Sequence, residues 1–133
     1  MYRFIPLALV ALTGCGKGGD TAAAVGDTRF SSIRDEILVP SCGFDSCHGA
    51  GGGAGDLVLD ADGSYAALVD VPSAVVDGEV LVIPGDADGS YLVKKLEGAS
   101  GIDGEAMPPG GQSLDADAIA RVRGWIDAGA AND

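Results

Sequence analysis

Residues 41–48 read SCGFDSCH, and this stretch decides how the rest of the chain is interpreted. Cys42 and Cys47 are separated by four residues, and His48 directly follows the second cysteine. His48 is the only histidine of the chain. Thiols and an imidazole on one short loop can anchor a group covalently and present a nitrogen ligand to a metal.

The pattern is close to the C-x-x-C-H signature of c-type haem attachment, with four residues between the cysteines in place of two. Two such thiols add to the vinyl groups on one edge of a porphyrin, which aims the next histidine at one face of the iron. Cys42, Cys47 and His48 are therefore candidates for holding one haem.

Met107 is the candidate second ligand of the iron. It is the only methionine besides Met1, and it precedes two prolines in the loop before the last predicted helix. A Met/His ligand pair raises the reduction potential relative to two histidines, which suits an electron carrier.

Three other interpretations remain open. The two cysteines could form a local disulfide, giving a haem-free surface lipoprotein that acts as a structural or interaction module. His48 could bind zinc with Asp45 or Asp56, although a fourth ligand is missing. Met107 could fill a gap in the core and leave the iron open on one side, as in a haem enzyme or a gas sensor.

The N-terminal residues are typical of a targeting segment. Arg3 supplies a positive charge, and residues 4–12 (FIPLALVAL) form an apolar run. This run is shorter than the roughly 20 residues that span a bilayer, so it fits a secretory signal. The following residues, ending at Cys15, read LTGC and resemble a bacterial lipobox, in which the cysteine is lipidated and becomes the new N-terminus.

We therefore expect a signal peptide over residues 1–14, a flexible tether over 15–28 that starts at lipidated Cys15, and one domain over 29–133. The tether lacks large apolar residues at regular spacing. The protein would be exported and anchored to a membrane by its lipid. Gly16 follows the cysteine, which by resemblance to Gram-negative lipoproteins implies the outer membrane, facing the periplasm or the cell surface.

The composition limits the classes of partner. There are 20 acidic and 8 basic residues, a formal net charge of −12, so nucleic acid is excluded as a partner. An acidic surface instead steers encounters with basic proteins, here basic redox partners. Aromatic residues make up 5% of the chain and 22 residues are glycine, so a haem would supply apolar bulk that the side chains lack.

Two helices are expected in the domain. The first covers residues 30–39 with Phe30, Ile33 and Ile37 on one face, and Pro40 ends it. The last covers residues 116–128, and it is expected to pack against the first helix. The candidate N-terminal caps are Thr28, Ser31 or Ser32 for the first helix and Ser113 or Asp115 for the last, with Gly129 after its end.

The hexapeptide DADGSY occurs twice, at residues 60–65 and 86–91. A calcium loop of the EF-hand type has glycine at its sixth position, whereas glycine is fourth in both copies. Each copy is therefore predicted to form a turn that leads into a short helix, with Asp or Ser oxygens accepting free N–H groups.

From residue 30 to residue 130 the chain resembles small single-haem class I cytochrome c domains of the type found in planctomycete and myxobacterial surface proteins. The matching stretches are VPSC (39–42), CHG (47–49), YAALV (65–69), VIPGD (82–86), SYL (90–92), MPPG (107–110) and WIDAGA (125–130).

This resemblance implies a mostly α fold, in which long Gly-rich loops surround one haem c and the first and last helices cross beside it. It implies thioether bonds from Cys42 and Cys47, with His48 and Met107 as the axial ligands of the haem iron. The function implied is electron transfer, not enzymatic catalysis.

Overall fold

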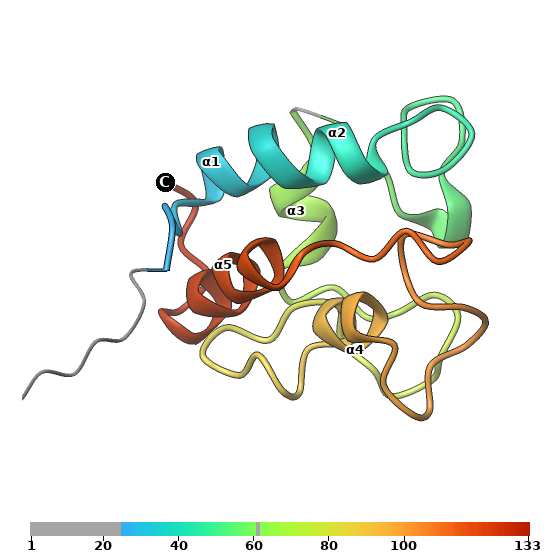
Figure 1. Cartoon of the computed structure of the whole chain (residues 1–133). Coiled ribbons are helices and arrows are strands. Elements are labelled where there is room, and N and C mark those ends of the chain that lie inside the picture. The colour runs from blue at the N-terminus through green and yellow to red at the C-terminus, as the bar shows by residue number, and fades with distance from the viewer. Residues whose placement is uncertain (1–24, 61) are drawn as a thin grey trace, which may run out of the picture.

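The computed structural model describes residues 25–60 and 62–133, which form short helices joined by long loops (Figure 1). The helical elements are α1 (Phe30–Ile33), the π-helix η1 (Arg34–Leu38), α2 (Val39–Cys42), the 3₁₀ turn η2 (Ala54–Asp56), α3 (Ser64–Leu68), α4 (Tyr91–Glu97) and α5 (Ala116–Asp127). Within these residues there are isolated bridges but no strand. The predicted mostly helical class is confirmed. The predicted signal peptide, Cys15 and most of the tether lie outside the described residues.

The first helical segment runs without a break through α1, η1 and α2, so the prediction that Pro40 ends it is wrong. Pro40 lies in the first turn of α2, immediately after the π-helical turn. A proline inside a regular α-helix removes one hydrogen bond and clashes with the preceding turn, but the π turn before Pro40 already departs from that regular pattern. The helix therefore continues to Cys42, which becomes its last residue.

The predicted caps of this helix are also wrong, because α1 has no side-chain cap from its own neighbours. Its first N–H groups are satisfied by the far end of the chain. The Phe30 N–H donates to Asp133 Oδ1 at 2.8 Å, and the Ser31 N–H donates to the Asp133 carbonyl at 2.9 Å. The last residues of the chain thus fix the start of the first helix.

The helix α5 matches its prediction and packs against α1. Asp115 caps it by accepting the Ala118 N–H at 2.7 Å, and Gly129 follows its end with a φ of 107°. Trp125 is buried and its ring lies 5.0 Å from that of Phe30. The predicted apolar face of the first helix, which consists of Phe30, Ile33 and Ile37, is also buried. The two helices therefore share one core.

In their described residues, the two hexapeptide copies form a turn before a short helix, as predicted. The predicted caps are wrong, because no side-chain oxygen caps α3 (Ser64–Leu68) or α4 (Tyr91–Glu97). Asp60 Oδ1 accepts the Gly63 N–H, and Asp86 Oδ1 accepts the Gly89 N–H, each at 2.8 Å. The serine of each copy donates its hydroxyl to the carbonyl of the same aspartate. Helices α3 and α4 follow these turns, so the repeat positions two short helices in the same way.

Candidate functional site

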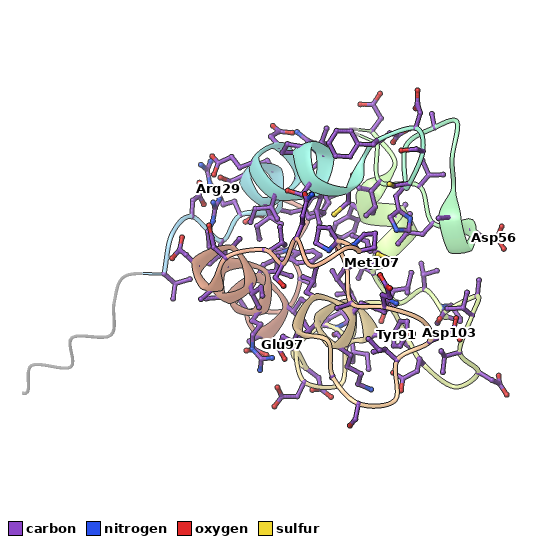
Figure 2. All side chains as sticks on the ribbon, turned by 45° about the vertical axis from the view of Figure 1, so that its right-hand side comes forward. Arg29, Asp56, Tyr91, Glu97, Asp103 and Met107 are labelled. Carbon is purple, nitrogen blue, oxygen red and sulfur yellow. The ribbon has the colours of Figure 1, made fainter. Side chains whose placement is uncertain are left out.

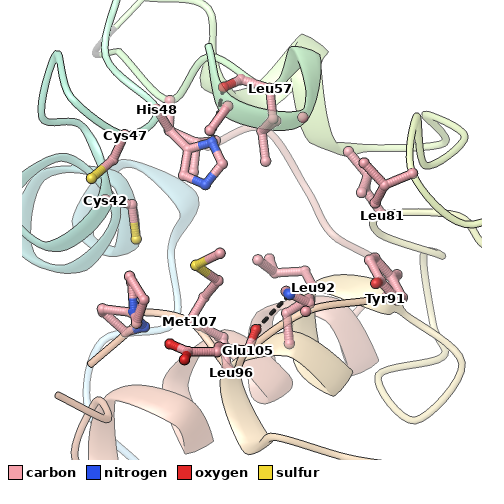
Figure 3. A pocket seen from close by; sticks show the side chains of 18 of the residues that line it. Cys42, Cys47, His48, Leu57, Leu81, Tyr91, Leu92, Leu96, Glu105 and Met107 are labelled. Atoms are coloured by element: carbon pink, nitrogen blue, oxygen red, sulfur yellow. Dashed lines mark hydrogen bonds between the residues drawn. The ribbon is translucent and has the colours of Figure 1, made fainter. Parts of the chain in front are cut away.

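A cavity of about 600 Å³ lies between α2, α3, α4 and the two long Gly-rich loops (Figure 3). All four residues that were predicted to hold the haem line it: Cys42, Cys47, His48 and Met107. Six leucines contribute much of the remaining wall: Leu57, Leu59, Leu68, Leu81, Leu92 and Leu96. Segments far apart in the sequence thus meet at one apolar cavity that has a few polar or sulfur-bearing groups.

The four residues between the cysteines form a closed loop. The Cys47 N–H donates to the Phe44 carbonyl at 2.8 Å, and the His48 N–H donates to the Cys42 carbonyl at 3.1 Å. The second bond brings His48 back against the end of α2. The wider spacing is therefore absorbed by a local turn, and both cysteines still line the same cavity.

The chain after His48 packs against this loop at two glycines, where there is no room for a side chain. A Cβ atom at Gly49 would lie 2.7 Å from the Gly43 carbonyl oxygen, and one at Gly52 would lie 2.6 Å from the Cys47 carbonyl oxygen. Both distances are shorter than a carbon and an oxygen tolerate. This part of the cavity wall can therefore form only because these two positions after His48 are glycine.

The His48 imidazole is held in one orientation. Its Nδ1 lies 3.0 Å from the Leu57 carbonyl oxygen, and since a carbonyl only accepts, Nδ1 carries the proton. Nε2 is then the nitrogen with a free lone pair, and Figure 3 shows the ring reaching into the cavity toward Met107. Histidines that bind metals are commonly fixed by such a hydrogen bond from their other ring nitrogen.

The two cysteines differ in their surroundings. Cys42 is buried and Cys47 is half-buried, and both are free thiols rather than partners in a disulfide. Burial raises the pKa of the Cys42 thiol to about 11, and the neighbouring charge of Cys47 adds to this effect. Cys42 is therefore a protonated, poorly nucleophilic thiol at neutral pH when no group is attached to it.

Met107 reaches the cavity from the loop that joins α4 to α5. Its N–H donates to the Lys95 carbonyl at 2.8 Å, which ties this loop to α4. The Tyr91 hydroxyl accepts the Asp103 N–H at 3.0 Å in the same loop (Figure 2). Figure 3 shows the Met107 thioether on the side of the cavity opposite His48.

Tyr91, Lys95 and the leucines also line the cavity, and they are not among the residues predicted for the site. Leu92, Lys95 and Leu96 have the i, i+3, i+4 spacing of one helix face, so their common side was visible in the sequence. The spacing does not show how α4 packs against the rest of the domain, so it could not predict that this face lines the cavity.

The zinc interpretation finds no support in the described residues, since nowhere in them do three or more His, Cys, Asp or Glu side chains gather as a metal site. Asp45 and Asp56 both lie on exposed stretches of the chain near His48. Across residues 25–60 and 62–133, no helix is long and apolar enough to cross a membrane.

The chain was compared with known proteins in three ways, and none of the comparisons found a match, neither the scan against protein-family models nor the searches of curated proteins and of solved structures. The function is therefore argued from the cavity itself.

Proposed function

We propose that this chain is an exported, lipid-anchored c-type cytochrome, which carries single electrons through one covalently bound haem c. One observation carries the proposal. Cys42, Cys47, His48 and Met107, which are distributed over 66 positions of the sequence (from 42 to 107), line the same cavity. Two thiols on one wall and a facing nitrogen and sulfur are the complete donor set for a six-coordinate haem c.

The size and the lining of the cavity fit a haem. Its volume of about 600 Å³ is within the range of roughly 300–1,000 Å³ in which small molecules and cofactors are bound. The leucine side chains provide the apolar contact that a porphyrin needs. The protonated Nδ1 of His48 leaves Nε2 as the ligand, which matches the way protein imidazoles bind iron.

In this role each of the four site residues would have one task. Cys42 and Cys47 would bind the haem edge as thioethers, and His48 and Met107 would be the axial ligands. The haem supplies an iron that alternates between the ferrous and ferric states as one electron enters from a reduced partner and leaves to an oxidised one. If both His48 and Met107 were bound to the iron, no coordination site would be left for a substrate, so we propose a carrier and not an enzyme.

The charge distribution supports redox partners with basic surfaces. Among the described residues, each arginine and Lys94 is paired with a carboxylate, and Lys95 is bonded to carbonyls of its own chain. The remaining carboxylates are in excess, in line with the net charge of −12. The unbalanced charge of this part of the surface is therefore negative, and it would guide docking of basic proteins. The proposed lipid on Cys15 would keep this exchange close to a membrane.

The axial ligand is tested by Met107→Ala in the full chain, produced with c-type maturation. We expect the wild-type ferric protein to have the far-red absorption band of a methionine–iron bond. The variant should lack this band and have a lower reduction potential. A variant with the same spectrum and potential as the wild type would remove Met107 from the iron, and would favour a haem enzyme or a gas sensor with an open distal side.

A further inference from the structure

Lys95 has an unusual combination of contacts in the candidate site. It lies on α4 and lines the cavity, and among the described residues it is the only lysine or arginine that does so. Its Nζ donates to the Asp103 carbonyl at 2.7 Å and to the Glu105 carbonyl at 2.6 Å. Its ammonium is thus bound to two backbone oxygens of the loop that contains Met107.

The main chain of Lys95 holds the same loop. Its carbonyl accepts the Met107 N–H at 2.8 Å. The chain reverses just after α4 at Gly98, with a φ of 64°, and then runs back along the helix. Lys95 therefore contacts the returning loop at three positions, two through its side chain and one through its backbone.

The side-chain contacts lie immediately before Met107 in the sequence. Asp103 is fixed from two directions, because Tyr91 accepts its N–H and Lys95 binds its carbonyl. Met107 is only half-buried, and residues 103–105 before it are exposed. Hydrogen bonds to an ammonium are stronger than those between neutral groups, so the two bonds from Lys95 restrain this segment together with the contact to Tyr91.

We propose that Lys95 is a positioning residue, whose ammonium holds the 103–107 segment so that the Met107 thioether stays directed into the cavity. The proposal rests on the proposed function for its consequence at the iron. Without the ammonium, the bond from Met107 N–H to the Lys95 carbonyl remains, so the fold persists. The segment before Met107 then moves more freely, and the thioether is displaced more easily from an iron.

The test compares Lys95→Leu with two matched variants of the full chain. Lys94→Leu removes the same charge from the neighbouring position of α4, where the lysine binds Glu79 at 2.7 Å and does not line the cavity. Lys95→Arg keeps a cation that can donate to the two carbonyls. Amide hydrogen exchange is followed in the haem-free chain, and imidazole binding to ferric iron is followed in the haem-loaded chain.

In Lys95→Leu we expect faster amide exchange over residues 99–107, with α5 unchanged. In the haem-loaded protein we expect a weaker methionine–iron band. Imidazole should bind at least about tenfold more tightly, which is the factor expected for the loss of one hydrogen bond to a charged group. Lys94→Leu should match the wild type in these measurements, and Lys95→Arg should restore them.

Two results would overturn the proposal. One is a Lys95→Leu variant whose exchange and imidazole affinity equal those of Lys94→Leu. The other is a reduction potential that changes while the methionine–iron band and the amide exchange do not. That result would mean that Lys95 acts through its positive charge near the haem and not by holding the loop. A wild-type chain that takes up no haem would refute the proposed function, whereas the exchange measurement would still decide whether Lys95 holds the loop.

Discussion

At the scale of single residues, the chemistry of the cavity comes from two thiols, one imidazole and one thioether. Cys42, Cys47, His48 and Met107 are rare residue types in this chain, so their chemistry could be recognised without a structure. The orientation of His48 could not, because its partner is the backbone carbonyl of Leu57, an atom that every residue has. Contacts to backbone atoms leave no signature in the sequence.

The difference in burial between the two cysteines leads to a prediction on reactivity. In the haem-free chain, an alkylating reagent should modify Cys47 at neutral pH, while Cys42 should react only as the pH approaches about 11. The reason is that the thiolate is the reactive form and burial keeps Cys42 protonated. Peptide mass spectrometry after timed alkylation at several pH values measures both rates. Equal rates at neutral pH would contradict the burial of Cys42.

The same pKa has a consequence for stability. A thiol whose pKa is raised from 9.0 to about 11 on folding favours the folded state below pH 9, and this contribution is lost as the pH rises from 9 to 11. The haem-free chain should therefore unfold more easily over this pH interval, and Cys42→Ala should reduce the change. Chemical denaturation at a series of pH values shows whether this slope exists.

At the scale of elements, periodicity predicted α5 and its caps correctly because all the signals lie within the helix and its flanks. The first helix extended past its predicted end. Proline is a dependable breaker only where the helix keeps its regular hydrogen bonds, and the π turn of η1 changes that condition. The extension places Cys42, which lines the cavity, at the end of a helix.

The loop after His48 provides a prediction with a close control. Gly52→Ala should destabilise the domain by about 1–3 kcal/mol, since its Cβ would overlap backbone oxygens that cannot move independently. At Gly51 the nearest atom to an added Cβ is 3.6 Å away, an ordinary contact. Gly51→Ala should therefore change the stability by less than about 0.5 kcal/mol. Denaturant unfolding compares the two variants, and equal losses would show that the loop is not closed as described.

At the scale of the whole molecule, the two ends of the domain are joined. The pairing of Asp133 with the start of α1 spans 103 positions, and no local pattern predicts it. The apolar stripe of the first helix and the face of α5 did predict that these helices pack, because each helix alone is too short to be stable in water. The cavity is a property of the whole fold, which is why sequence reasoning could name its donor atoms but not its leucine walls.

Replacing Asp133 tests the contact between the end of the domain and the start of α1. Asp133→Ala should lower the free energy of unfolding by about 1 kcal/mol, as for the loss of other helix caps. Asn132→Ala, a change at the exposed neighbouring position, is the control and should have little effect. Thermal unfolding of both variants gives the comparison. A stability loss that is the same in both would mean that the contact with α1 does not contribute.

The most direct test of the central claim is the intact mass of the full chain, produced in a host with c-type maturation and denatured before measurement. We expect the mass of the processed chain from Cys15 with its lipid, plus one haem, together with the absorption spectrum of a six-coordinate c-type haem. A variant with both Cys42→Ala and Cys47→Ala should lose the covalent haem. A colourless wild-type protein without the added mass would contradict the account, and it would favour a haem-free lipoprotein with a Cys42–Cys47 disulfide.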